Sequence, residues 1–215
     1  MTNNTNDRGM ELAKSLKNEL GDILVSVIRY ERSEYLVVAE NLNFHTLKII
    51  KKLMQEQNIS FPLFLKRCGV LKACDVFPME FLNMKVDYEI IYGEDILKNL
   101  SFKKEHVARE LEFELRTKLI TLRQAYLNAK TAEEMKTLIK RAIPTMRPVC
   151  AGLLFVSGRE IPGTTEQILS ADYGIDMQIL NKINREEIKE NEFEYIIKRL
   201  IEMLEKLIGD VNEVI

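Results

Sequence analysis

The stretch "ILVSVIRYERSEYLVVAENL", residues 23–42, carries the clearest indication of the fold of the amino-terminal half. Two runs rich in β-branched residues flank a short polar tip, Tyr-Glu-Arg-Ser-Glu, at residues 30–34. Apolar runs of this kind around a few polar residues predict two strands joined by a tight turn. The function of the protein depends on whether this tip is only a turn or the remnant of a catalytic loop.

Composition limits the class of protein that the chain can be. Its 215 residues are 46% hydrophobic and 30% charged, which is ordinary for a globular protein with a core. The formal net charge of -2 argues against a general nucleic-acid binder, because such proteins need an excess of Lys and Arg to neutralise phosphates. The length suits one large domain or two small ones.

The chain shows no sign of export or of a membrane anchor. Its first residues lack the basic and apolar regions of a signal peptide, and no apolar run approaches the roughly 18 residues of a membrane-spanning helix. Three cysteines (Cys68, Cys74 and Cys150) match no disulfide scaffold. We therefore expect a cytoplasmic protein with reduced thiols and no membrane partner.

Residue spacing predicts an α/β arrangement in the first half of the chain. Leucines four residues apart predict a helix over 10–20, stopped by Gly21. A second helix is expected over 45–57, followed by strand, helix and strand up to Gly93. Alternating apolar residues predict one of these strands at 77–81.

The second half reads as helical. One long helix is expected over 103–129, and a capping box at Thr131 restarts a helix that Pro144 ends. A further helix cap is expected at Thr164. The last helix is expected to begin at residues 184–187 and to end at Gly209. The predicted fold is α+β: a flexible terminus at 1–9, an α/β domain with a small mixed sheet at 10–102, and a carboxy-terminal helical bundle at 103–215.

Few residues suggest chemistry by themselves. The cysteines lack zinc-site spacing, His45 and His106 stand alone, and phosphate-loop and serine-hydrolase motifs are missing from the sequence. Three acids converging from neighbouring strands could hold Mg²⁺, and Glu34, Asp75 and Glu80 are the candidates. From spacing alone, solvated charges at strand ends are the favoured interpretation.

The motifs "CDVFPMEF" at 74–81, "YGED" at 92–95 and "ELRTKLITLRQAYL" at 114–127 resemble a group of prokaryotic nucleotidyltransferase-like proteins. These belong to the DNA polymerase β-like superfamily, and the resemblance runs from about Gly21 to Asn181. It implies a small mixed sheet with helices followed by a helical bundle. Active members carry Gly-Ser after the first strand, an Asp-x-Asp or Asp-x-Glu pair on the second, and a third acid later, which together hold two Mg²⁺ ions and a triphosphate.

This chain departs from the family pattern at the tip. Glu31 and Arg32 replace Gly-Ser, and the loop is shortened. The pair Ser33-Glu34 matches the start of the second strand, but the second acid of the pair falls at Leu36, which cannot bind a metal. The later-strand acid matches Glu80, or Asp75 if the alignment shifts.

Three hypotheses follow from the resemblance. The first is a nucleotidyltransferase-fold protein without catalytic activity, which binds a protein partner or its own second copy through the helical bundle. The second is a Mg²⁺-dependent nucleotidyltransferase with a rearranged site, in which Glu34, Asp75 and Glu80 hold one metal while Arg32 and Ser33 contact phosphate. The third is a nucleotide sensor that uses Arg116 and Arg123. The first hypothesis requires no cofactor.

Overall fold

The computed structural model describes residues 3–31, 34–57, 62–170 and 178–213. The chain divides into two compact units. The first comprises Met1–Asp75 and Asp87–Ser101, and the second comprises Val76–Val86 and Phe102–Ile215. Arg32 and Ser33, the two residues predicted to contact nucleotide, lie outside the described residues.

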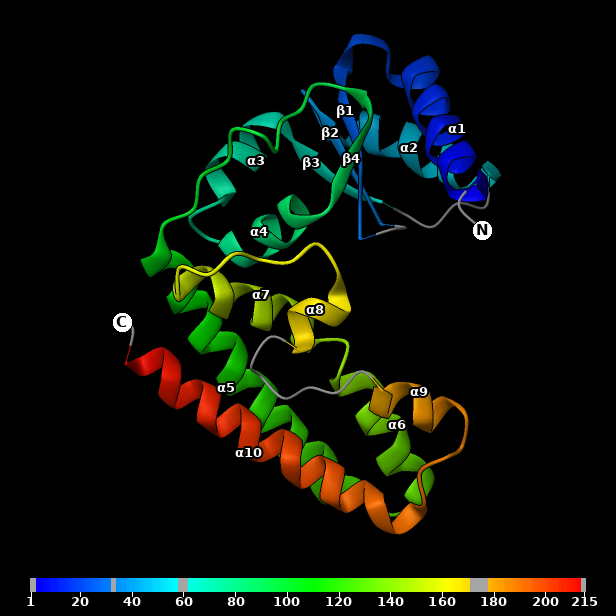
Figure 1. Ribbon diagram of the computed structural model, residues 1–215. Coiled ribbons are helices and arrows are strands. Elements are labelled where there is room, and N and C mark those ends of the chain that lie inside the picture. Colours follow the sequence, from blue (N-terminus) through cyan, green and yellow to red (C-terminus); the bar gives the residue numbers. More distant parts are fainter. Residues whose placement is uncertain (1–2, 32–33, 58–61, 171–177, 214–215) are drawn as a thin grey trace. The chain divides into compact units, whose positions relative to one another are not determined.

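The first unit is a small α/β layer structure (Figure 1). In chain order its elements are α1 (Asn3–Leu20), a 3-10 turn (Gly21–Ile23), β1 (Leu24–Tyr30), β2 (Glu34–Ala39), α2 (Phe44–Gln57), β3 (Leu63–Lys66), α3 (Arg67–Ala73) and β4 (Tyr88–Gly93).

The hairpin predicted at residues 23–42 is confirmed. Strands β1 and β2 pair antiparallel, with Val27 opposite Val37 and Tyr30 opposite Glu34. The sheet has the order β3-β2-β1-β4 in the described residues; β4 is antiparallel to β1, and β3 is parallel to β2. The mixed sheet predicted for this half of the chain is therefore present.

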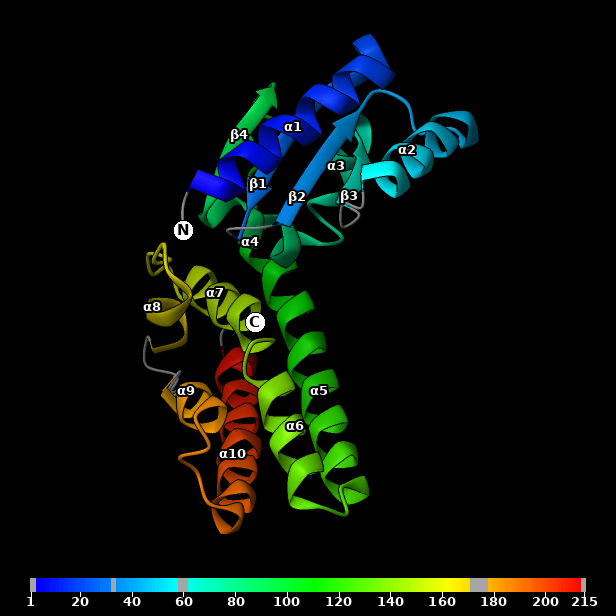
Figure 2. The same cartoon turned by 90° about the vertical axis from the view of Figure 1, so that its right-hand side faces the viewer.

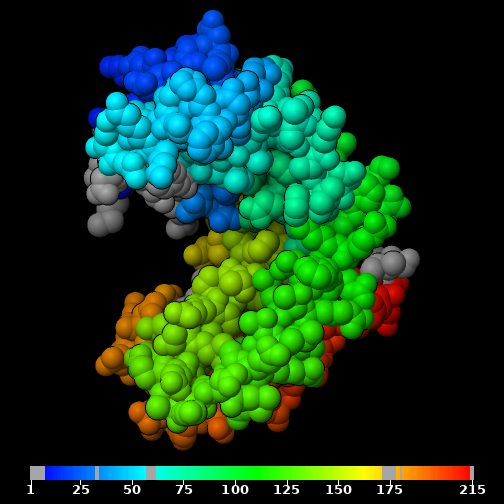
Figure 3. Space-filling model, turned by 180° about the vertical axis from the view of Figure 1, so that it is seen from behind, coloured from blue at the N-terminus to red at the C-terminus, as the bar shows by residue number. Residues whose placement is uncertain are grey.

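One face of the sheet packs against helices α1 and α2 (Figure 2). Leu16 of α1, Val27 of β1 and Val37 of β2 are all fully buried in this layer. The opposite sheet face is buried too, since Ile28 and Leu36 have no exposed surface. Burial on both faces explains why the strands read as near-continuous apolar runs rather than as an apolar-polar alternation. Figure 3 shows α2, in light blue and cyan, at the surface of this unit.

The first helix is longer than its apolar spacing predicted. It begins at Asn3, within the segment expected to be a flexible terminus, and ends at Leu20. Gly21 then adopts a φ of 55°, a left-handed conformation that glycine reaches at little cost. The predicted stop of this helix is therefore confirmed.

The regular elements in the described part of the second unit are helices. In chain order these are α4 (Pro78–Val86), α5 (Lys104–Asn128), α6 (Ala132–Ala142), α7 (Met146–Val156), α8 (Thr165–Ser170), α9 (Gln178–Asn184), a 3-10 turn (Glu190–Glu192) and α10 (Phe193–Asn212). Leu111 and Leu115 of α5, Leu154 of α7 and Leu204 of α10 lie in one buried core. The predicted long helix and helical bundle are thus present.

Two predicted helix caps are confirmed. The Thr131 hydroxyl accepts a hydrogen bond from the Glu134 amide at 3.2 Å, and the Glu134 carboxylate accepts one from the Thr131 amide at 3.1 Å. This reciprocal pair satisfies two amides that the first turn of α6 leaves without helical partners. The Thr164 hydroxyl likewise accepts from the Gln167 amide at 3.3 Å, before α8.

The strand predicted at residues 77–81 is wrong, because this segment belongs to helix α4. Pro78 is the first residue of that helix, a position where proline's fixed φ fits and its missing N–H costs nothing. The Met79 amide donates to the Glu110 carboxylate on α5 at 2.8 Å. Burial raises the pKa of Glu110, the nearby carboxylates of Glu114 and Glu80 add to the rise, and the Met79 amide opposes it.

The start predicted for the last helix is also wrong. Asn184 ends α9, and residues 185–187 form the turn after it instead of beginning α10, because Glu186 adopts a φ of 59°. The Glu186 amide donates to Ile183 O and the Glu187 amide to Lys182 O, the hydrogen-bond pattern of a Schellman motif. Helix α10 begins at Phe193 and runs past Gly209, which was predicted to stop it.

Candidate functional site

The three predicted catalytic acids occupy exposed positions in different elements. Glu34 is the first residue of β2, Asp75 lies between α3 and α4, and Glu80 is in the first turn of α4. Glu34 and Asp75 belong to the first unit and Glu80 to the second. Within the described residues, no three His, Cys, Asp or Glu side chains are grouped so that they could hold a metal ion.

The arginines considered for nucleotide binding are paired with acids on their own unit. Arg116 donates to Glu112, one turn earlier on α5, at 2.9 Å, a four-residue spacing at which opposite charges on a helix pair. Arg123 forms an ion pair with Glu205 of α10. Both pairs are exposed, so each adds little to stability.

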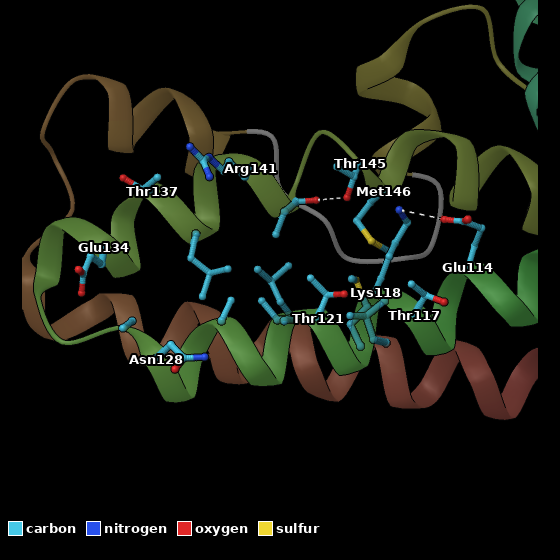
Figure 4. A pocket seen from close by; sticks show the side chains of 18 of the residues that line it. Glu114, Thr117, Lys118, Thr121, Asn128, Glu134, Thr137, Arg141, Thr145 and Met146 are labelled. Carbon is cyan, nitrogen blue, oxygen red and sulfur yellow. Dashed lines mark hydrogen bonds and ion pairs between the residues drawn. The ribbon is translucent and has the colours of Figure 1, made fainter.

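A cavity of about 740 Å³ lies within the helical unit, between α5, α6 and α10. We call it the α5–α6 groove. Figure 4 shows side chains from α5 and α6 on its two sides. The apolar residues that line it are Leu122, Ala125, Ala129, Leu138, Ala142, Met146, Leu200, Met203 and Leu204. The polar residues are Glu114, Thr117, Lys118, Thr121, Asn128, Glu133, Glu134, Thr137, Arg141 and Thr145.

The groove exists because short side chains line the facing sides of two adjacent helices. Helix α5 ends at Asn128 and α6 begins at Ala132, so the connection is short and the two form a helical hairpin. On α5, Thr117, Thr121 and Ala125 follow one another at four-residue steps along the groove. Such short side chains leave space that leucines at the same positions would fill.

Larger apolar side chains close the base of the groove. Leu122, Leu200 and Leu204 are buried, each with less than a tenth of its surface exposed. They belong to the core that α5 shares with α10. An apolar base with polar residues around it is typical of pockets that bind small organic molecules, whose volumes are about 300–1,000 Å³. The α5–α6 groove falls inside that range.

Most charges around the groove already have partners. Lys118 pairs with Glu114 at 3.3 Å, and Glu133 pairs with Lys136 at 3.4 Å. The Glu134 carboxylate accepts from the backbone amides of Lys130, at 2.6 Å, and of Thr131. Arg141, in the last turn of α6, has no hydrogen bond or ion pair to any described residue.

The thiols and histidines take separate positions. Cys68 is exposed, Cys74 is half-buried and Cys150 is buried. Burial raises the pKa of the Cys150 thiol to about 12, so it is inert as a nucleophile. His106 lies 3.6 Å from Glu105 in the first turn of α5, and His45 is exposed in α2.

One feature of the sequence is related to the groove but was not considered when the helices were predicted. A helix with one buried face shows apolar residues at steps of three and four, and α5 has them from Val107 to Leu122. The stripe of Thr117, Thr121 and Ala125 runs beside these residues. In the folded protein this stripe of short side chains faces the groove.

Comparisons with protein-family models, curated proteins and solved structures gave no match. None of the helices in the described part of the chain has the length and apolar character that crossing a membrane requires.

Proposed function

We propose that this protein acts by binding a small organic ligand in the α5–α6 groove, as a nucleotidyltransferase-like protein without transferase activity. The observation that carries the proposal is the groove itself, with its cavity of about 740 Å³, its base of buried leucines and its polar surroundings. A volume of this size takes up a molecule of metabolite or drug size and removes most of its surface from water.

The exposed positions of the candidate acids support a non-catalytic role. Two-metal nucleotidyl transfer needs carboxylates that converge on both cations. Glu34 at the start of β2 and Glu80 in the first turn of α4 are both exposed. Exposed carboxylates are stable without a bound cation, and an acid in the first turn of a helix, as Glu80 is, is favoured by the helix dipole.

The proposal is tested by ligand screening with a blocked groove as control. Thermal shift against a library of small molecules, and against ATP, GTP, CTP and UTP with and without Mg²⁺, reports binding. A ligand at 100 times its dissociation constant stabilises the protein by about 2.7 kcal/mol. Ligands that stabilise the wild type are expected to lose their effect in Thr121→Trp, because Thr121 is exposed beside the groove and a bulky ring there blocks it without overpacking the core.

Two results would overturn the proposal. In the first, every ligand that stabilises the wild type also stabilises Thr121→Trp and a second groove variant, Ala125→Phe, to the same extent. The other is Mg²⁺-dependent transfer of a labelled nucleotide that disappears in Glu34→Gln, Asp75→Asn or Glu80→Gln. The second result would favour the alternative of an active enzyme with a rearranged carboxylate site.

Self-association through the helical bundle stays a prediction of the sequence. Sedimentation velocity over a concentration series measures it directly, with and without a ligand found in the screen.

A further inference from the structure

The charges around the α5–α6 groove are distributed unevenly along α6. Glu133 and Glu134 lie in its first turn and Arg141 in its last. Seven residues separate Glu134 from Arg141, which corresponds to about 10 Å along a helix. At physiological ionic strength this distance exceeds the Debye length of about 8 Å. The two ends of the groove therefore present different charges to a ligand.

The acidic end is already neutralised or hydrogen-bonded. Glu133 is paired with Lys136, and the Glu134 carboxylate is held by backbone amides of the capping box. A cationic ligand group would have to displace these contacts. It would also lose the pairing that stabilises the start of α6.

The other end presents a cation without a partner. Arg141 is exposed, lines the groove and contacts no acid in the part of the chain that the structure describes. A guanidinium presents several N–H donors in a planar fork that matches a carboxylate, sulfonate or phosphate. Thr145, one turn further on, lines the same end and adds a hydroxyl.

We propose that the α5–α6 groove takes an apolar molecule that carries one anionic group, with the anion bound at Arg141. This inference rests on the proposed function and names the class of ligand. The apolar body lies on Leu138, Ala142 and Met203, which line the groove and are each half-buried in the absence of ligand. Removal of this apolar surface from water supplies affinity, and Arg141 supplies the preference for a negative charge.

The test uses two fluorescent probes that differ in one group. Anilinonaphthalene sulfonate carries a sulfonate, and phenylnaphthylamine has the same aromatic body without it. Fluorescence titration of the full chain is expected to give a lower dissociation constant for the sulfonate probe. Arg141→Gln is expected to weaken binding of the sulfonate probe about fivefold and to leave binding of the neutral probe unchanged.

A matched control separates Arg141 from general charge effects. Arg109 is also exposed, lies on α5 outside the groove lining and has no partner among the described residues. Arg109→Gln changes the net charge by the same amount and is expected to leave both dissociation constants unchanged. Equal losses in the Arg109→Gln and Arg141→Gln variants would overturn the inference, because long-range charge would then explain the preference.

The design also separates the inference from the proposed function. If Thr121→Trp abolishes binding of both probes but Arg141→Gln has no effect, the groove binds ligands and the anionic assignment is wrong. If Thr121→Trp and Ala125→Phe change neither probe while circular dichroism shows folded proteins, the groove is not the binding site and both proposals fall. Loss of sulfonate binding in Arg141→Gln alone supports the inference.

Discussion

Gly93 permits the close approach of strands β1 and β4, and replacing it with alanine tests that approach. It is the last residue of β4, opposite Ser26 of β1, and its φ is 81°. A Cβ atom built on Gly93 would lie 2.0 Å from the carbonyl oxygen of Val25 and 3.0 Å from its carbonyl carbon. That oxygen also accepts a hydrogen bond from the Glu94 amide at 3.2 Å. Alanine therefore cannot fit unless one strand moves.

The expected cost combines three effects. A left-handed backbone costs alanine about 1–2 kcal/mol more than glycine. Forcing an extra carbon against a packed strand costs about 1–3 kcal/mol, and weakening the hydrogen bond to Val25 O costs about 1 kcal/mol. Gly93→Ala is thus expected to destabilise the protein by about 3–5 kcal/mol, the sum allowing for partial relaxation.

Gly21 provides a matched control in the same unit. Its φ is 55°, but a Cβ atom there would meet nothing within 4 Å. Gly21→Ala should therefore cost only the backbone part, about 1–2 kcal/mol. Urea unfolding followed by circular dichroism measures both variants against the wild type. Equal losses in the two variants would refute the argument, because they would show that contact with Val25 contributes nothing.

Three further predictions use the same physical reasoning. Thr131→Ala removes the capping box of α6 and is expected to lower the free energy of unfolding, measured in urea, by about 1 kcal/mol. Thr131→Ser retains the hydroxyl and should lose much less. An equal loss of stability in both variants would contradict the role of the hydroxyl as a cap. The raised pKa of Glu110 means that its charged form is disfavoured in the folded state, so its contribution to stability falls as pH rises through that pKa. Glu110→Gln should therefore raise the melting temperature at pH 7, and this gain should vanish near pH 4, where the carboxyl group is protonated. A gain that grew on acidification would contradict this reasoning. A colorimetric thiol reagent should react with exposed Cys68 in the native protein and with Cys150 only after unfolding; fast native labelling of Cys150 would show that it is accessible.

Features that depend on neighbours in sequence were predictable. The long helix α5 follows from apolar residues at steps of three and four, because a helix repeats every 3.6 residues. The hairpin of β1 and β2 follows from two apolar runs around a short polar tip. The cap at Thr131 follows from a spacing of three residues to Glu134, since both partners lie in the same turn.

Helix α4 shows why spacing misled at residues 77–81. Apolar residues at positions 77, 79 and 81 alternate as in a strand, yet Pro78 and Glu80 are also a proline at the first helical position and an acid in the first turn. The Glu110 carboxylate, 31 residues away, binds the Met79 amide. This contact satisfies an amide at the start of α4, and no local pattern could reveal it.

The hairpin of β1 and β2 and the helical character of the second half could be predicted from the amino-acid sequence, because each depends on residues close together in the chain. The groove between α5, α6 and α10, and the position of Arg141 beside it without a partner among the described residues, became visible only in the folded protein. The residues that line the groove extend from Glu114 to Leu204 along the chain. Whether helices pack tightly or leave a space depends on side-chain volumes at facing positions, and those positions are set by the fold.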